Sequence, residues 1–484
     1  MDLKTFGTLI SFICLLATAS IAQTPDQKTN RAVYNRIEYF FNAQQLDSIY
    51  ALANEDFQAQ ISNTQLRGIL DQLSSLGKIN NASIYKFEKG IAGYKVEFDS
   101  ETLSIILGVD SNRRYHTLAF QPYKQPNDNN PETALTKDSV ISNVETKSAL
   151  DIFVDSVARK YAKQNAAQSL AVAVIHKNKI NTFFYGETAK GNHVLPDANT
   201  QYEIGSLTKT FTASLLADMI NKGVVNLEDS IATYLPDSVA QNPFIQKITF
   251  RMLANHTSGL PRMAENYNTS PAYTPSDPYA KYTRTDLYSF LKNYQGTGEP
   301  GTEYLYSNVA YGLLGELLAE IGKKPYLQLI SELILTPLEM NSTSDHIDKK
   351  DTNIAVPHDA KGQEVPFWNF QALTAAGSLK SNLNDMLRYT IAQLTYPETA
   401  IQQAMNLTKQ FTFNVSPTSD IGLAWHMNMI EGLIYYQHSG ATAGSNSFVG
   451  FVPDEKSVVI ILSNANLGVE EMGIELLEKV LTTK

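Results

Sequence analysis

The sequence predicts an α/β (α+β) fold: an antiparallel sheet flanked by helices, joined to an all-helical domain and preceded by a small α+β domain. Stretches with period-2 alternation occur near both ends of the region from residue 144 onward, and they predict a sheet built from both termini of that region. Between them, from about residue 206 to 400, the apolar residues have mainly helical spacing. In front, two helical segments precede four alternating stretches, a pattern typical of a small α+β domain.

Length and composition limit the classes of protein to which this chain can belong. It has 484 residues, 43% of them hydrophobic and 18% charged, which is ordinary for a folded chain of two or three domains. The formal net charge is −10 and no basic face is evident, so a nucleic-acid partner is not expected. A small-molecule or peptide substrate fits this charge better.

The N-terminus has the pattern of a signal peptide, for which we predict the bounds 1–22. Lys4 supplies a weakly positive start, residues 6–17 are apolar, and Ser20 and Ala22 suit a signal peptidase. The alternative is a membrane anchor, since an apolar stretch of roughly 17 residues is borderline for spanning a bilayer. The polar run 23–28 favours cleavage. We therefore expect a periplasmic or secreted protein with no membrane span after cleavage.

Cysteine and histidine usage argues against a metal site. The single cysteine, Cys14, lies inside the signal segment, so the mature chain would have no thiol for a disulfide, a zinc site or a nucleophile. The eight histidines are dispersed without the spacing of metal ligands. We expect neither a metal nor another cofactor.

Residues 30–122 form the predicted small domain, and a linker follows at 123–143. Helices are expected at 31–52 and 63–76, and strands at 81–88, 92–98, 102–109 and 115–122. The domain resembles the cone-shaped or cystatin-like domains found in front of exported bacterial hydrolases. It holds no constellation that indicates chemistry, so a binding or spacing role towards an envelope or protein partner is expected. The linker includes a polar stretch bracketed by prolines at 125–132.

The second domain is expected to span 144–484. It opens with an amphipathic helix near Val144 and a strand pair at 169–176 and 179–185. Three further strands are expected at 433–437, 447–452 and 457–462, before a terminal helix at 469–481.

The segment Gly205-Ser206-Leu207-Thr208-Lys209 has the pattern of an activated nucleophile. A serine hydroxyl needs a group that removes its proton, and a lysine three residues later on a helix shares its face. Ser206 precedes the apolar helix expected from Phe211, where the helix dipole favours developing negative charge. The same spacing recurs at Ser75 and Lys78, so the pattern alone is not specific.

Two later tripeptides give this pattern its specificity. Tyr306-Ser307-Asn308 and His438-Ser439-Gly440 follow Ser206 and Lys209 in an order that resembles the serine β-lactamase and penicillin-binding-protein superfamily, most closely its class C branch with carboxypeptidases and esterases. The resemblance covers about residues 145–482, and further matching stretches lie at 256–260, 300–302, 337–340 and 376–379.

The resemblance implies a β-lactamase/transpeptidase-like fold and a set of roles. Ser206 would form an acyl-enzyme, while Lys209 and Tyr306 would form the proton network, with the general base left open between them. Asn308 would hold Lys209 and contact the substrate. The third tripeptide would contribute His438 and Gly440 to substrate binding, and the backbone N–H groups of Ser206 and Ala441 would form the oxyanion hole.

The third tripeptide departs from the pattern of many β-lactamases, which carry a lysine where this chain has His438. Histidine is only marginally charged at neutral pH, so it would anchor a substrate carboxylate less well. This favours hydrolysis of a D-amino-acid peptide or an ester over β-lactamase activity. The alternatives left open are a β-lactamase and a non-catalytic penicillin-binding or sensor protein that keeps the fold.

Three other features receive weaker interpretations. The glycine pattern at 296–301 lacks a preceding strand and is discounted as a dinucleotide site. The resemblance makes His256 a structural turn rather than a catalytic group. Three tyrosines in a proline-rich stretch could line a substrate cleft: Tyr273, Tyr279 and Tyr282.

Overall fold

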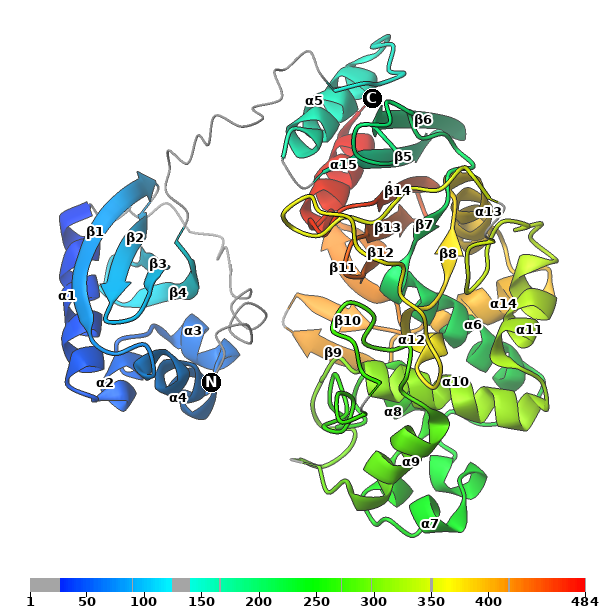
Figure 1. Cartoon of the computed structure of the whole chain (residues 1–484), viewed down its shortest axis with the longest axis horizontal. Helices are drawn as coiled ribbons and strands as arrows, with labels where there is room; N and C mark the ends of the chain where they lie inside the picture. The colour runs from blue at the N-terminus through cyan, green and yellow to red at the C-terminus, as the bar shows by residue number, and fades with distance from the viewer. Residues whose placement is uncertain are drawn as a thin grey trace. The chain divides into compact units, whose positions relative to one another are not determined.

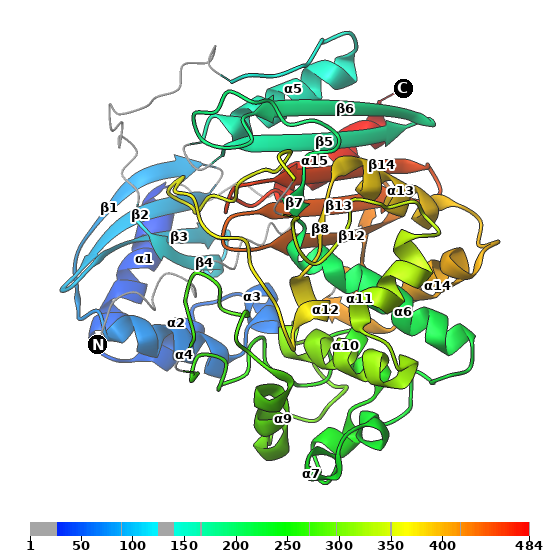
Figure 2. The same cartoon turned by 45° about the vertical axis from the view of Figure 1, so that its right-hand side comes forward.

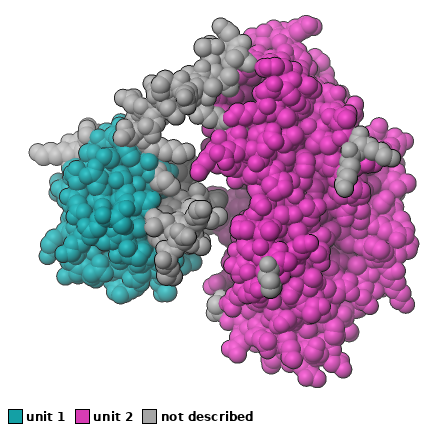
Figure 3. Space-filling model, in the orientation of Figure 1, with its two compact units in different colours: residues 1–134 teal, residues 135–484 magenta. Residues whose placement is uncertain are grey.

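The computed structural model describes residues 27–88, 90–123, 140–164, 167–270, 272–296, 298–348, 351–416 and 418–483. The chain divides into two compact units, residues 1–134 and 135–484 (Figure 3). The expected signal peptide at 1–22 and residues 124–139 of the expected linker lie outside the described residues. A search of the described helices found none with the length and apolar character that a membrane span requires.

Unit 1 packs four helices on a four-stranded antiparallel meander (Figure 1). The elements are α1 (Gln27–Asn42), α2 (Leu46–Tyr50), α3 (Glu55–Gln60), α4 (Asn63–Ser74), β1 (Ile79–Glu88), β2 (Ile91–Phe98), β3 (Thr102–Val109) and β4 (Tyr115–Pro122). The single helix predicted over 31–52 is wrong, because the chain turns between Asn42 and Leu46 with Gln44 at a φ of 58°. Because the apolar residues keep helical spacing on both sides of this turn, the sequence pattern predicts one continuous helix.

A buried asparagine ties the first helix of unit 1 to its sheet. Asn30 is fully buried, and its amide donates to the carbonyl oxygens of Gly90 at 3.0 Å and Leu107 at 2.8 Å. Its side-chain oxygen accepts from the Tyr94 hydroxyl at 2.8 Å. A buried amide with its partners in place fixes one packing arrangement and would destabilise others. Unit 1 therefore has a specific core of its own.

Unit 2 is built on an eight-stranded antiparallel sheet in the order β6-β5-β14-β13-β12-β11-β10-β9. The strands are β5 (Ser169–His176), β6 (Lys179–Gly186), β9 (Phe413–Ser416), β10 (Ser419–Ile421), β11 (His426–Ile430), β12 (Leu433–Ala441), β13 (Asn446–Val452) and β14 (Ser457–Ser463). The predicted antiparallel sheet from both ends of the region is confirmed, with β14 paired to β5. The short strands β9–β11 were not predicted. Residues 140–143 also pack on this unit, where Ser142 pairs with Tyr185 and Val140 is buried.

Helices cover both faces of this sheet (Figure 2). On β14, Val459 and Ile461 pack with α5 (Ala149–Ala162) and α15 (Glu470–Thr482), while Ile460 and Leu462 face the helical region. Successive side chains of a strand point to opposite faces, so a strand covered on both sides is apolar throughout. The central strands therefore form a rigid layer against which the site is built.

The helical region lies between β6 and β9 in the chain. Its helices are α6 (Thr208–Asn221), α7 (Asp237–Ala240), α8 (Phe250–Ala254), α9 (Arg284–Asn293), α10 (Asn308–Gly322), α11 (Tyr326–Ile330), α12 (Thr374–Gly377), α13 (Leu383–Leu394) and α14 (Ala400–Thr408), with β7 (Tyr202–Glu203) paired to β8 (Lys380–Ser381). α6 is buried along nearly its whole length, as expected of a helix that is not strongly amphipathic. Together with α10 it carries the candidate site.

Candidate active site

The turn that carries Ser206 lies directly against the end of β12. Gly205–Leu207 form a 3₁₀ turn that continues into α6, so Ser206 stands just ahead of the α-helix. Gly205 has a φ of +49°, and a Cβ there would lie 2.8 Å from the Ala441 nitrogen. A Cβ on Gly440 would lie 2.0 Å from the Ile204 carbonyl oxygen. Both positions need glycine because the two backbones touch, and this contact brings Ala441 beside the serine.

Lys209 is fully buried on the first turn of α6. Its Nζ lies 3.0 Å from Ser206 Oγ, 2.8 Å from Asn308 Oδ1 and 2.6 Å from the carbonyl oxygen of Ala376. Burial, and then the charge of Arg262, hold the pKa of Lys209 well below its usual range. A neutral amine has two N–H donors and one lone pair, which match two carbonyl acceptors and one hydroxyl donor. The amine is therefore arranged to accept a proton from Ser206.

Ser307 explains the spacing of Tyr306 and Asn308. It is the N-cap of α10, since its hydroxyl accepts from the Ala310 N–H at 2.9 Å and donates to the Pro261 carbonyl at 2.7 Å. Asn308 is consequently the first residue of the helix and Tyr306 stands before it. The centre of the Tyr306 ring lies 4.9 Å from Lys209 Nζ. Burial raises the pKa of Tyr306 to about 12, although a hydrogen bond with Ser206 opposes the rise.

A backbone clamp, formed by residues 256–262 against residues 305–308, holds this tripeptide in place. The Leu305 N–H donates to the His256 carbonyl at 2.7 Å, and the Asn308 N–H donates to the Arg262 carbonyl at 3.1 Å. The Ser307 N–H donates to His256 Nδ1 at 3.1 Å, and the His256 ring packs 4.3 Å from that of Tyr306. His256 lies at a φ of 62°, as a tight turn requires. These contacts agree with the expectation that His256 belongs to a structural turn.

His438 lies on β12 as a buried and neutral residue. Its Nδ1 is 2.7 Å from the Ser439 carbonyl oxygen and must donate there, while Nε2 is buried without a hydrogen-bond partner among the described residues. Burial, followed by the nearby His426 and Lys209, lowers the pKa of His438 well below its usual range. The imidazole therefore supplies no positive charge at neutral pH. The sequence predicted a weaker anchor for a substrate carboxylate than lysine, and burial weakens it further.

The structure adds groups that the sequence did not single out. The carbonyl of Ala376 is one, and the exposed side chain of Arg262 is another: its guanidinium carbon lies 5.1 Å from the centre of the Tyr306 ring. A backbone carbonyl leaves no signal in residue identity. Arg262 could have been found from its position directly after the matching stretch at 256–260 and Pro261.

Of the tyrosines expected to line a cleft, Tyr279 contacts the candidate site. Its hydroxyl accepts from Asn308 Nδ2 at 3.3 Å, and its ring stacks on Phe370 with the centres 4.7 Å apart. Tyr282 is buried and donates to Asn266 Oδ1 at 2.9 Å, so it supports the fold. Tyr273 packs edge-on against Tyr267. Across the described residues, no group of three histidine, cysteine or acidic side chains is arranged to hold a metal.

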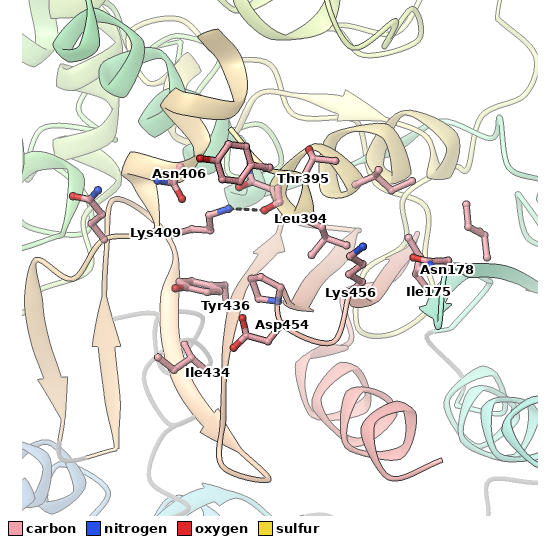
Figure 4. Close-up of a pocket in the computed structure, with 16 residues that line it drawn as sticks. Ile175, Asn178, Leu394, Thr395, Asn406, Lys409, Ile434, Tyr436, Asp454 and Lys456 are labelled. Atoms are coloured by element: carbon pink, nitrogen blue, oxygen red, sulfur yellow. Dashed lines mark hydrogen bonds between the residues drawn. The ribbon is translucent and has the colours of Figure 1, made fainter. Parts of the chain in front are cut away.

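A hollow of about 980 Å³ lies away from these residues, between α13, α14 and the sheet (Figure 4). Tyr436 of β12, Asp454 of the β13–β14 turn and Lys409 line it. On β12, Tyr436 is five residues from Ala441, which corresponds to roughly 17 Å of strand. The hollow contains none of the predicted site residues.

Comparison with known proteins agrees with this geometry. Residues 154–482 match the family model described as "Beta-lactamase". The D-alanyl-D-alanine-carboxypeptidase/endopeptidase AmpH of Escherichia coli strain K12 is 29% identical over 323 residues, which cover 63% of this chain and 82% of AmpH. A β-lactamase of Providencia stuartii is 26% identical over 367 residues, covering 68% of this chain and 91% of that protein.

Solved structures are similar in fold. A β-lactamase/D-alanine carboxypeptidase from Pseudomonas syringae has a TM-score of 0.60 at 24% identity, covering 69% of this chain and 99% of that one. A class C β-lactamase has a TM-score of 0.61 at 23% identity, covering 69% and 96%. With the family model matching more than half of the sequence, the chain belongs to the β-lactamase family and is a serine hydrolase.

Proposed function

We propose that this serine hydrolase is exported and hydrolyses a D-amino-acid peptide or an ester through an acyl-enzyme on Ser206. The observation that supports it most strongly is the buried Lys209 amine, which lies within hydrogen-bond distance of Ser206 Oγ and two carbonyl oxygens. A hydroxyl becomes a nucleophile when an adjacent base takes its proton, and burial gives this amine the lowered pKa that a base needs at neutral pH.

In the proposed acylation step, Ser206 Oγ bonds to the carbonyl carbon while its proton passes to Lys209. The N–H groups of Ser206 and Ala441 stabilise the oxyanion, a contribution of roughly 3–4 kcal/mol per donor in such sites. The bond to the leaving group then breaks, and Tyr306, protonated because its pKa is about 12, donates the proton that the leaving group needs. Lys209 returns its proton to Tyr306. Water repeats the sequence to release the acid and free Ser206.

The choice of substrate rests on His438 and on the relatives. A neutral imidazole at this position provides no charge for a substrate carboxylate, unlike the lysine of many β-lactamases, which supports a substrate preference different from theirs. The relative AmpH is named as a D-alanyl-D-alanine-carboxypeptidase/endopeptidase, which supports a peptide substrate. β-Lactam hydrolysis is the second candidate, because other relatives are named β-lactamases.

A turnover panel tests this proposal. It contains a D-Ala–D-Ala peptide, a D-aminoacyl amide, short-chain 4-nitrophenyl esters and a chromogenic cephalosporin, each assayed with the purified protein. We expect turnover of the peptide or the esters to exceed that of the cephalosporin, with an acyl adduct found by mass spectrometry on the peptide that contains Ser206. Preferred turnover of the cephalosporin would support the second candidate. An adduct without any turnover would indicate a sensor that keeps the fold.

Export and a role for unit 1 are further parts of the proposal. The charged start, apolar run and small residues of positions 1–22 support cleavage after Ala22. A mature N-terminus other than Gln23 would contradict this cleavage site, and a protein retained in the cytoplasm would contradict export. Unit 1 has its own core, and the residues of the candidate site named above all belong to unit 2, which supports a binding role of unit 1 towards an envelope or protein partner. Deleting residues 24–134, which leaves the buried Val140 of unit 2 in place, should then change localisation while turnover is kept.

A further inference from the structure

Arg262 presents an exposed positive charge beside Tyr306, with no ion pair to any of the residues that the structure describes. Its backbone belongs to the clamp, because its carbonyl accepts the Asn308 N–H and the preceding Pro261 carbonyl accepts the Ser307 hydroxyl. Its guanidinium lies over the ring of Tyr306, whose hydroxyl is hydrogen-bonded to Ser206. The backbone of Arg262 is therefore held by the same contacts that hold Tyr306 and Asn308, and its guanidinium packs on the Tyr306 ring.

The other arginines of unit 2 are paired with carboxylates, and Arg262 is not. Within 4 Å the described residues place no aspartate or glutamate oxygen around its guanidinium, although the side chain is exposed. Each of the other four has an acidic partner: Arg159, Arg251, Arg284 and Arg388. When a guanidinium stacks on an aromatic ring, its planar face contacts the ring. The N–H groups at its edge can then donate hydrogen bonds to a carboxylate.

The other basic side chains near the site are not available to bind an acid. Lys209 is enclosed by three hydrogen-bond partners and His438 is buried and neutral. Lys380 is also buried, with its Nζ on the carbonyl oxygens of Asp345 and Trp368. Among the described residues around Ser206, Arg262 is the exposed cation.

We propose that Arg262 binds a carboxylate of the substrate, so that the preferred substrates are acids with a free carboxylate near the scissile bond. This inference rests on the proposed function. Arginine suits this task because its planar guanidinium can donate two parallel hydrogen bonds to one carboxylate. Arg262 would thus provide a positive charge that position 438 lacks.

Matched substrate pairs test this specificity. Mono-4-nitrophenyl succinate and 4-nitrophenyl butyrate share a leaving group and differ by a carboxylate on the acyl side; a D-Ala–D-Ala peptide acid and its amide differ on the leaving-group side. In the wild type we expect the acid of at least one pair to have the higher kcat/KM. Arg262→Gln should lower that acid-to-neutral ratio by about 10- to 100-fold, the usual loss for a charged hydrogen bond, while Arg262→Lys keeps part of it. The responding pair identifies the side on which the carboxylate binds.

The neutral substrates control for indirect effects. Removing the Arg262 charge also alters the proton affinity of Tyr306 and Lys209, but this changes both members of a pair alike and cancels in the ratio. Lys281→Gln removes one positive charge from an exposed site on a nearby loop of the helical region and should leave the ratios unchanged. Ratios for Arg262→Gln equal to those of the wild type in both pairs would overturn the inference.

A binding measurement separates this inference from the proposed function. If the wild type turns over none of these substrates, the proposed function fails, and the Ser206→Ala protein can still be titrated with the peptide acid and the amide by calorimetry. Tighter binding of the acid that is lost in the Ser206→Ala/Arg262→Gln double variant supports Arg262 as the carboxylate site. Equal affinity for acid and amide contradicts it.

Discussion

Ser206→Ala is expected to lower kcat for the best ester of the panel by about 10³- to 10⁶-fold, as removal of the nucleophile does in other serine hydrolases. The hydroxyl lies 3.0 Å from the Lys209 amine, and the proposed mechanism places the acyl group on it. Kinetic assays with 4-nitrophenyl esters measure the loss, and labelling by a fluorophosphonate should disappear with it. Thermal unfolding should change little, because the substitution removes a single, partly exposed hydroxyl.

Ser75→Ala is the matched control for this experiment. Ser75 and Lys78 repeat the three-residue spacing of Ser206 and Lys209, but Ser75 is the exposed C-cap of α4 in unit 1. The Ser75 hydroxyl donates to the Gln72 carbonyl at 2.6 Å, an ordinary contact at the end of a helix. This variant should keep full activity and full labelling. Persistent labelling of Ser206→Ala would show that another residue is the nucleophile.

Lys209→Met should lower kcat/KM by about 10³-fold, within the 10²–10⁴ range of a lost general base. Methionine has a similar length but accepts no proton, and it leaves Asn308 Oδ1 and the Ala376 carbonyl without their donor. Each buried acceptor without a partner costs about 1–3 kcal/mol, so the melting temperature should also fall. Steady-state kinetics at a temperature well below that melting point separate the two effects.

The pH profile distinguishes a base from a structural lysine. The pKa of Lys209 in the folded protein lies well below its usual range because the amine is buried, and in the proposed mechanism the unprotonated amine is the active form. The kcat/KM of the wild type should therefore rise as the pH rises through that pKa, and Lys209→Met should lose this limb. Lys380→Met controls for stability, since Lys380 is another buried lysine with Nζ on two carbonyl oxygens. A Lys209→Met variant within tenfold of wild type would exclude a role as the base.

The fold class could be predicted because burial determines the sequence pattern of its main elements. The strands β5, β13 and β14 are buried along almost their whole length, so their apolar residues indicate them directly. The strands β9–β11 were missed because they are short and largely half-exposed, which leaves little alternation to detect. The break between α1 and α2 was missed because the residues on both sides face the same core.

The candidate site was predictable where side-chain identity carries the chemistry. The order of Ser206, Lys209, Tyr306 and Asn308 in the sequence led to residues that the structure places in contact. The rest depends on partners that no local pattern reveals. Ala376 acts through its backbone, and Arg262 matters because the chain folds its guanidinium onto Tyr306. That no carboxylate of the described residues pairs with Arg262 is likewise a property of tertiary structure alone.

The backbone clamp has a consequence for how this enzyme can diversify. Residues 256–262 and 305–308 hold one another across the chain, so the backbone of Tyr306 and Asn308 is anchored outside the segment that joins them. Part of that segment belongs to the core, since Tyr282, Leu287 and Leu291 are buried. Residues 265–270 and 272–278 are mostly exposed or half-exposed, and they lead to Tyr279 beside Asn308. We therefore expect substitutions in these two stretches to change substrate preference while the clamp, and the residues that it holds, stay in place.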